Sequence, residues 1–200
     1  MVSPARSWRL LAAVSASALV LTACGGSDDP DDTTNPAPGA STGGSDAQGD
    51  GVLTIGSLLP QTGNLAFLGP PEFAGVELAV EEINEAGGVL GNPIEYIEGD
   101  SGDAQQDVAN PTVDRLLAAG ADVIVGAASS GVSFTVIDKI TSAGVVQISP
   151  ANTSPDFTDY DDNGLYFRTA PSDVLQGQVL AEVIAEEGIG TIGILALQDP

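Results

Sequence analysis

Beyond residue 50, two kinds of apolar pattern alternate along the chain. Short, nearly continuous apolar runs rich in β-branched residues are typical of strands that are buried on both faces of a parallel sheet. Between them lie segments whose apolar residues recur three and four positions apart, which predicts amphipathic helices. The predicted strands are 52–59, 94–97 (shorter and half polar), 121–128, 145–149 and 191–197.

Glycines mark the ends of the predicted helices. The first helix carries glutamates opposite its apolar stripe and ends at Gly87 and Gly88, the third ends at Gly144, and the fourth spans 173–187. Strand and helix in alternation predict an α/β fold with a doubly wound parallel sheet and right-handed crossovers. The apolar stripes are Phe73, Val76, Val80 and Ile83; Val113, Leu116 and Leu117; Val132, Val136 and Ile140; and Val174, Leu180, Val183 and Ile184.

The start of the second helix, which stops at Gly120, has two interpretations. Asn110 and Pro111 fit an N-cap followed by proline at the first helical position. A helix that begins near Ala104 and is kinked at Pro111 fits the sequence as well.

The first 23 residues have the pattern of an export signal, with Arg6 and Arg9 before an apolar run at 10–21. The run is too short to span a membrane as a helix. Leu-Thr-Ala-Cys, ending at Cys24, resembles a bacterial lipobox, which implies that the Cys24 thiol is lipidated and becomes the first residue of the mature protein. We therefore expect a lipid-anchored protein on the extracytoplasmic face of the cell membrane. An ordinary secretory signal with an incidental cysteine is the alternative.

Residues 24–50 are rich in glycine, proline, serine and aspartate and contain no large apolar residue. Such a segment cannot offset the entropy of folding, so we expect a disordered tether. As a flexible coil it would reach on the order of 30 Å from the membrane.

Charge and composition exclude several classes of function. Without residues 1–23 the chain has 28 acidic and three basic residues, a formal charge of −25. Such a surface repels phosphate backbones, so a nucleic-acid partner is not expected. The chain has no histidine, and therefore lacks the commonest general base and neutral metal ligand. Residues 159–164 match half of a calcium loop, but Ala170 stands where the bidentate glutamate belongs, so we predict a solvated turn and no metal or cofactor.

Ligands of open α/β sheets bind beyond the carboxyl ends of the strands. Those ends carry small and hydroxyl residues at 60–63, 128–131 and 149–155. Ser129 and Ser130 also open the third helix, whose free amides suit a small anion such as a carboxylate. A simpler interpretation is that one of these serines only caps the helix.

Six short motifs stand out between residues 52 and 200. They are Leu59-Pro-Gln-Thr-Gly63, Gly75-Val-Glu-Leu-Ala79, Gly87-Gly-Val-Leu-Gly91, Val125-Gly-Ala-Ala-Ser-Ser130, Ser149-Pro-Ala-Asn-Thr153 and Phe167-Arg-Thr169. Together they resemble the branched-chain amino-acid-type substrate-binding proteins of bacterial ABC transporters, almost without gaps from 52 to 200. The resemblance implies a periplasmic binding protein type I fold with two lobes that close on a ligand. It places the first lobe at 51–171, with the hinge crossing at 168–171, and the beginning of the second lobe at 172–200, so we expect the chain to be an N-terminal fragment.

The resemblance also implies ligand contacts. Ser130, beside Ser129, resembles the serine that holds the ligand carboxylate. Ala151 resembles the residue whose carbonyl accepts from the ammonium group, and Thr153 the one that contacts both groups. Leu68, or Phe67 before it, lies where the family often places an aromatic residue over the ligand. Asn152 is polar where many members have a small apolar residue, which leaves the identity of the ligand open.

These observations predict a lipoprotein that captures a small polar metabolite, such as an amino acid, and delivers it to an ABC permease. Two alternatives stay open. The binding lobe could serve a signalling receptor, or the chain could belong to an extracytoplasmic α/β hydrolase whose catalytic residues lie in the missing half. Against catalysis, the sequence has no histidine, and the part predicted to fold, from residue 51 onward, has no Gly-x-Ser-x-Gly nucleophile motif.

Overall fold

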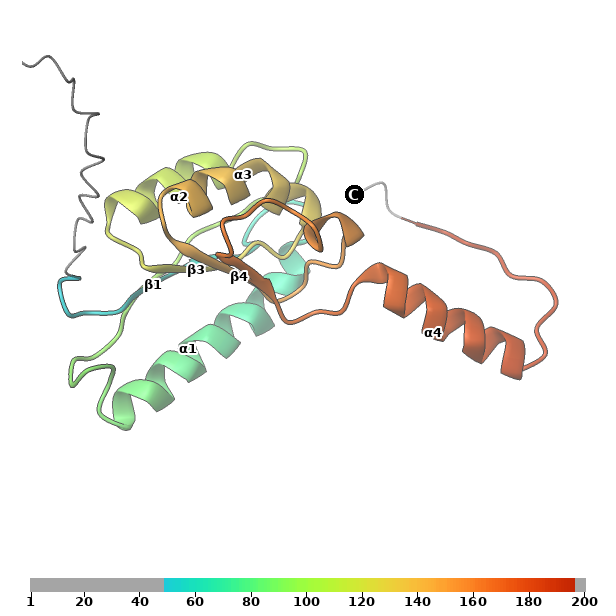
Figure 1. Ribbon diagram of the computed structural model, residues 1–200, viewed down its shortest axis with the longest axis horizontal. Coiled ribbons are helices and arrows are strands. Elements are labelled where there is room, and N and C mark those ends of the chain that lie inside the picture. The colour runs from blue at the N-terminus through green and yellow to red at the C-terminus, as the bar shows by residue number, and fades with distance from the viewer. Residues whose placement is uncertain (1–48, 197–200) are drawn as a thin grey trace, which may run out of the picture. The chain divides into compact units, whose positions relative to one another are not determined.

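The computed structural model describes residues 49–196, in which five parallel strands form one sheet in the order β2-β1-β3-β4-β5 (Figure 1). The predictions at 52–59, 94–97, 121–128 and 145–149 are confirmed, although each observed strand is shorter than predicted, because the flanking apolar residues leave the sheet as loops. The strands are β1 (Thr54–Leu58), β2 (Glu95–Ile97), β3 (Val123–Gly126), β4 (Val146–Ser149) and β5 (Tyr166–Arg168).

Helices cover both faces of this sheet, as the predicted α/β fold requires (Figure 1). Helix α1 (Gly69–Glu85) lies on one face, and α2 (Ala109–Ala118) and α3 (Ser130–Ser142) lie together on the other. The main hydrophobic core lies between the sheet and the α2–α3 pair. Its fully buried members include Leu58 and Ile124 from the sheet, Val113 and Leu116 from α2, and Val136 and Ile140 from α3.

All four α-helices of the described residues end at a glycine with positive φ, as predicted for the first three. At the end of α1, the Gly87 N–H donates to the Asn84 carbonyl at 3.1 Å and the Gly88 N–H to the Ile83 carbonyl at 2.9 Å. This pair of bonds satisfies carbonyls that the helix leaves unpaired, and the left-handed backbone costs glycine little. The same pattern recurs at Gly120, Gly144 and Gly188.

Neither interpretation of the start of the second helix is correct. Helix α2 begins at Ala109, one residue before Asn110, and Ala104 lies in a turn. Pro111 is therefore the third residue of the helix, where its missing N–H would have had no partner within the helix. The proline sits in the first turn and no kinked helix precedes it.

The predicted strand at 191–197 is wrong over 191–196, which is irregular; residue 197 lies outside the described residues. Ile194 and Leu195 are 85% and 101% exposed, so this apolar run is not buried here. An apolar run becomes a strand only where neighbouring strands accept its backbone hydrogen bonds, and no strand of the described residues pairs with it.

Strand β5 was not predicted, because Arg168 was assigned to a hinge crossing. Tyr166, Phe167 and Arg168 pair in parallel with Gln147, Ile148 and Ser149 of β4. Three residues with mixed polarity carry too little periodicity to predict a strand. These residues form a strand because their backbone groups pair with β4, not because their own sequence favours one.

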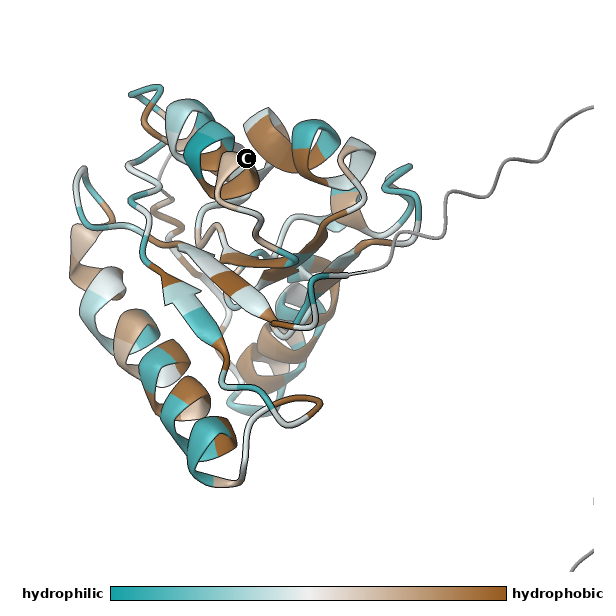
Figure 2. Ribbon diagram, turned by 90° about the vertical axis from the view of Figure 1, so that its left-hand side faces the viewer, coloured by the Kyte–Doolittle hydropathy of each residue, from teal (hydrophilic) through white to brown (hydrophobic). Residues whose placement is uncertain are grey.

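Helix α4 (Asp173–Glu186) confirms the predicted fourth helix, with Ser172 as its N-cap. Its apolar residues, Val174, Leu175, Val179, Leu180 and Val183, are each about half exposed or more. The strands of the sheet also contain apolar residues (Figure 2). Val125, Val146 and Ile148 are half-buried and alternate along β3 and β4 with buried residues, and Phe167 of β5 is exposed. Among the described residues, α4 and the sheet therefore both have apolar side chains that are accessible to solvent.

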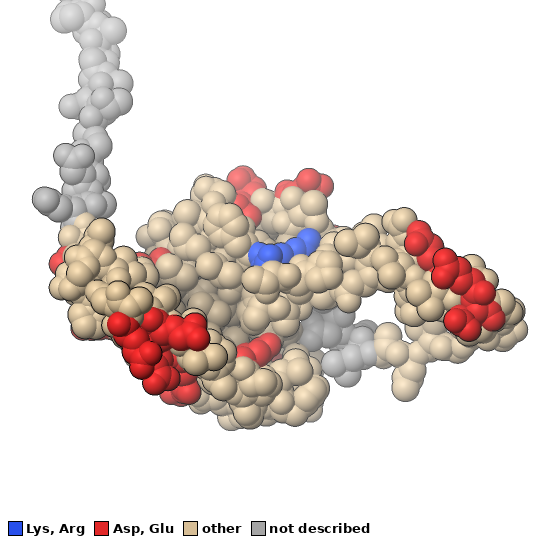
Figure 3. Space-filling view, turned by 90° about the horizontal axis from the view of Figure 1, so that it is seen from below, with Lys and Arg blue, Asp and Glu red and all other residues tan. Residues whose placement is uncertain are grey.

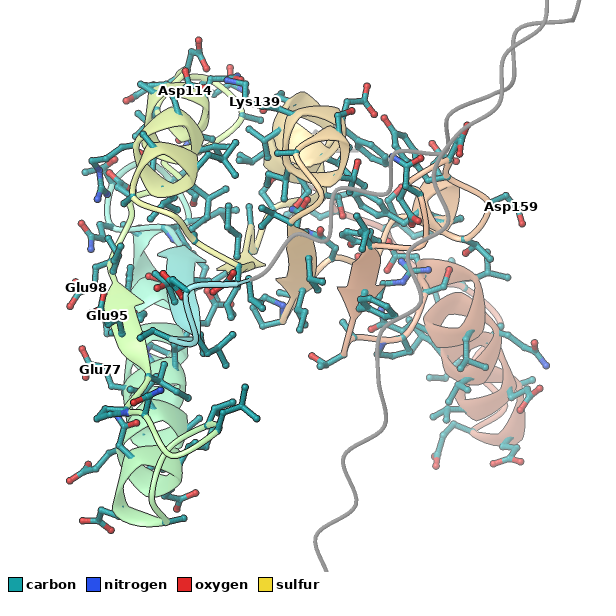
Figure 4. All side chains as sticks on the ribbon, turned by 60° about the vertical axis from the view of Figure 1, so that its left-hand side comes forward. Glu77, Glu95, Glu98, Asp114, Lys139 and Asp159 are labelled. Carbon is teal, nitrogen blue, oxygen red and sulfur yellow. The ribbon has the colours of Figure 1, made fainter. Side chains whose placement is uncertain are left out.

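Acidic side chains dominate the surface. They gather over α1 and over α4 (Figure 3), where Glu77, Glu81, Glu82 and Glu186 are exposed. Glu77, Glu95 and Glu98 follow one outer edge of the molecule, whereas Lys139 meets Asp114 between α3 and α2, with Nζ 2.8 Å from Oδ1 (Figure 4).

The predicted export signal, Cys24 and nearly all of the predicted tether at 24–50 lie outside the described residues. Within 49–196, the structure contains no helix with the length and apolar character needed to cross a membrane.

Candidate functional site

The loops that carry the predicted site residues lie at one edge of the sheet, beyond the carboxyl ends of β1, β3 and β4. The strand order reverses between β1 and β3, since the chain runs from β1 outward to β2 and then returns past β1 to β3. Ligands of doubly wound sheets bind at such a reversal. The geometry therefore agrees with the position predicted for the site.

Ser129 is the N-cap of α3. Its backbone is extended, and its Oγ accepts the N–H of Val132 at 3.3 Å. Of the two serines that could cap the helix, the structure therefore selects Ser129. Its predicted ligand contact stays a prediction.

Ser130, the first residue of α3, joins two of the loops. Its Oγ accepts the N–H groups of Thr153 and Ser154, each at 3.3 Å, and the residue is only 7% exposed. A serine Oγ has two acceptor sites and one proton to donate. The two loop amides take the acceptor sites, so the hydroxyl proton is left to be donated to a further acceptor.

Thr153 also contacts a residue that was not predicted. Its Oγ1 donates to Oδ2 of Asp173 at 2.9 Å, and the Asp173 N–H donates to the Thr153 carbonyl at 2.9 Å. Asp173 opens α4, directly after the predicted hinge crossing. The sequence signal was Ser172-Asp173 at a helix start, which indicates capping and says nothing of a contact with Thr153.

The structure places Ala151 beside this group and Leu68 on a different loop. Ala151 is half-buried after β4, and its N–H donates to Ser149 Oγ at 3.3 Å. Leu68 is half-buried at the end of a short 3-10 helix, η1 (Ala66–Leu68), and Phe67 before it is 72% exposed. A hollow of about 220 Å³ lies next to η1, lined by Pro60, Gln61, Ala66, Gly69, Pro70 and Phe73 rather than by Leu68.

Asn152 does not face the ligand edge. The residue is fully buried, and its side-chain amide donates to the carbonyls of Ala127 and Ala128 and accepts from the hydroxyl of Tyr166. Burial also raises the pKa of Tyr166 far above its ordinary value. The polar character of Asn152 therefore reflects an internal network rather than a contact with a polar ligand.

A second carboxylate, also not predicted, holds the loop after β1. Asp100 Oδ1 accepts the N–H groups of Gln61, Thr62 and Gly102, and its Oδ2 accepts the Thr62 hydroxyl at 2.6 Å. Asp103 adds a bond from the Asn64 N–H at 2.8 Å. Partial burial by itself raises the pKa of Asp100, but these hydrogen bonds outweigh it, so that its pKa is lowered.

We expect Asp100→Asn to destabilise the fold by about 1–2 kcal/mol at pH 7, because hydrogen bonds to a charged acceptor weaken and Asp100 is only partly buried. A lowered folded-state pKa contributes stability above the unfolded value of about 3.9, and this stability is lost as the pH falls through the folded pKa. The difference between the variant and wild type in the free energy of unfolding, measured with urea, should therefore become smaller below about pH 4. Asp107→Asn, which removes one exposed contact with Asn110, serves as the control. A difference that stays constant with pH would contradict the assignment.

The half calcium loop at 159–164 forms a turn, in which Asp162 Oδ1 accepts the Gly164 N–H at 2.7 Å. Across 49–196, His, Cys, Asp and Glu side chains nowhere gather in threes in a way that could hold a metal ion.

The chain is similar in sequence to proteins that are named for binding branched-chain amino acids. A Leu/Ile/Val-binding protein homolog 3 from Brucella melitensis is 34% identical over 135 residues, which cover 66% of this chain and 35% of that protein. This chain therefore spans about a third of that relative's length.

Two solved structures share the fold. The branched-chain amino acid transporter substrate-binding protein of Streptococcus pneumoniae, in complex with isoleucine, has a TM-score of 0.63 and 31% identity over 68% of this chain and 38% of that one. A solute-binding protein of an ABC transporter from R. palustris, in complex with benzoate, has a TM-score of 0.59 and 26% identity over 69% of this chain and 38% of that one.

The match to a family covers most of the chain beyond the predicted tether. Residues 52–200 match the family described as periplasmic binding protein. This span includes the whole described sheet, the three loops at its carboxyl edge and α4. The chain therefore belongs to the periplasmic binding protein family.

Proposed function

We propose that this chain comprises the first lobe and the beginning of the second lobe of an extracytoplasmic receptor that captures an α-amino acid and delivers it to an ABC permease. The observation that carries the proposal is the hydrogen-bonded group of Ser130, Thr153 and Asp173 at the carboxyl edge of the sheet. Hydroxyl and amide donors meet a carboxylate acceptor there, and an amino acid has the matching carboxylate and ammonium groups.

The ligands of the two structural relatives support a carboxylate anchor. Isoleucine and benzoate have a carboxylate in common, whereas only isoleucine has an ammonium group. We assign the carboxylate to Ser130 and to the first turn of α3, whose positive dipole end attracts anions. Ala151 contributes its carbonyl and Leu68 an apolar contact from the loop after β1. Thr153 contributes its hydroxyl oxygen, because its N–H and its hydroxyl proton already bond Ser130 and Asp173.

Asp173 favours an amino acid over a simple carboxylate. Its carboxylate is held 2.9 Å from Thr153 Oγ1, so a ligand anion bound at Ser130, beside Thr153, would lie close to a second negative charge. Like charges at such distances repel, and an ammonium group on the ligand would offset this repulsion. We therefore assign the ammonium group of the ligand to Asp173 and the Ala151 carbonyl.

Membrane attachment through Cys24 completes the proposal. The lipobox-like Leu-Thr-Ala-Cys and the acidic tether at 24–50 support a lobe that is anchored by lipid and stands off from the membrane. The relatives are named for binding and transport, which supports a binding role rather than catalysis.

Binding by the full-length protein tests the proposal. We expect L-isoleucine to raise the melting temperature and to give a saturable isotherm by calorimetry, since a ligand at 100 times its Kd stabilises the folded state by about 2.7 kcal/mol. Benzoate, which lacks the ammonium group, should bind more weakly. Absence of binding by both compounds and by the other proteinogenic amino acids would contradict the proposal.

A further inference from the structure

The residues after β3 are held by side chains from β4 and the loop that follows it. β3 ends at Gly126, and each of the carbonyls of 126–128 accepts a hydrogen bond from a side chain of the neighbouring segment. The donors are Gln147 Nε2 to Gly126 at 2.9 Å, Ser149 Oγ to Ala127 at 2.6 Å, and Asn152 Nδ2 to Ala127 at 3.1 Å and to Ala128 at 3.0 Å.

Asn152 has a single favourable orientation in this network. Its Nδ2 faces two carbonyl oxygens, and its Oδ1 accepts from the Tyr166 hydroxyl at 2.8 Å. A flipped amide would direct Oδ1 at both carbonyl oxygens and leave a buried acceptor without a donor. The side chain is 0% exposed, so water cannot compensate for a lost bond.

The same backbone segments carry the proposed ligand contacts. Ala127 and Ala128 lead directly into Ser129 and Ser130, and Asn152 lies between Ala151 and Thr153. The hydrogen bonds of the Asn152 side-chain amide therefore join the segment before Ser130 to the segment that contains Thr153. Ser130 Oγ completes the connection through the Thr153 N–H at 3.3 Å.

We propose that Asn152 is a positioning residue, whose side-chain amide fixes the loop after β3 against the loop after β4 so that the Ser130 hydroxyl is held in place, beside Thr153, to receive the ligand carboxylate. The inference rests on the proposed function, because it concerns how that site is kept in shape before the ligand arrives. A preformed donor spares the ligand the cost of ordering it.

Asn152→Ala removes the amide and leaves the ligand contacts themselves intact. We expect the affinity of the full-length protein for L-isoleucine to fall by roughly 3- to 10-fold, which corresponds to the ordering of one or two groups on binding. The affinity for L-isoleucinamide, which lacks the carboxylate charge, should change less. The ratio of the two affinities therefore shrinks, and a purely structural role would leave it unchanged.

Tyr166→Phe is the matched control. It removes the other hydrogen bond of Asn152 from the same buried network but keeps both bonds to the loop after β3. We expect a lower melting temperature, with the affinity ratio within about twofold of wild type. Asn152→Ser, which retains one hydroxyl donor, provides a milder variant if Asn152→Ala does not fold.

Calorimetry with both probes on wild type and variants distinguishes the outcomes. A smaller affinity ratio in the Asn152 variant and an unchanged ratio in Tyr166→Phe support the positioning role. An unchanged ratio in the Asn152 variant, or an equal loss in Tyr166→Phe, overturns it while the proposed function stands. If wild type binds another proteinogenic amino acid instead, that amino acid and its amide serve as the two probes. Failure of wild type to bind any of them overturns the proposed function, and the inference with it.

Discussion

Replacing Ser130 with alanine is expected to weaken L-isoleucine binding to the full-length protein by roughly 10- to 150-fold. A hydrogen bond to a charged group is worth about 1.5–3 kcal/mol, and the factor follows from that energy. L-isoleucinamide should lose much less affinity, because it has no carboxylate. Calorimetry with both compounds gives the two affinities.

Ser130→Ala also leaves the N–H groups of Thr153 and Ser154 without their acceptor, so some stability should be lost as well. Thr141→Ala is the control, since it removes another buried hydroxyl of α3 that bonds Ile137 far from the ligand edge. It should lower the melting temperature and leave affinity unchanged. If Ser130→Ala behaves in the same way, the proposed carboxylate anchor is misplaced.

Replacing Cys24 with serine is expected to release the mature protein from the membrane. Stable attachment requires acyl chains, each worth about 0.8 kcal/mol per buried CH₂, and serine offers no thiol to receive them. Cell fractionation with an antibody against the folded lobe measures the effect. Wild type should sediment with membranes, and Cys24→Ser should not.

Ser27→Ala, a change of one atom three residues downstream, controls for effects on export. It should leave the distribution of the protein as in wild type. Cys24→Ser that still sediments with membranes would favour the alternative of an ordinary secretory signal and another means of attachment.

The sequence correctly predicted those helices and strands that depend mainly on residues close to one another along the chain. The buried runs of β1, β3 and β4 and the glycines that end α1, α2 and α3 depend on residues within a few positions of one another. The start of α2 differed from both predictions because Pro111 is tolerated anywhere in the first turn. Strand β5 and the irregular segment 191–196 depend on whether a neighbouring strand is present, which local periodicity does not report.

The site was predicted less completely than the fold. Motif resemblance brought Ser130, Ala151 and Thr153 to one place, but it did not show that Asn152 turns inward or that Ser129 alone caps α3. Asp100 was missed because its partners lie 38 and 39 residues away along the chain. Such contacts follow from the strand order, which places the β2 loop beside the β1 loop.

The glycine turns have a consequence for how this protein can diverge. The turns at Gly87, Gly120 and Gly144 reverse the chain before β2, β3 and β4, at the edge of the sheet opposite the ligand loops. Chain reversal and ligand choice are therefore encoded in separate residues. Substitutions in the proposed ligand loops can change which small molecule is bound without altering the glycine turns that return the chain to the sheet. Selection can thus act on recognition and on foldability almost independently.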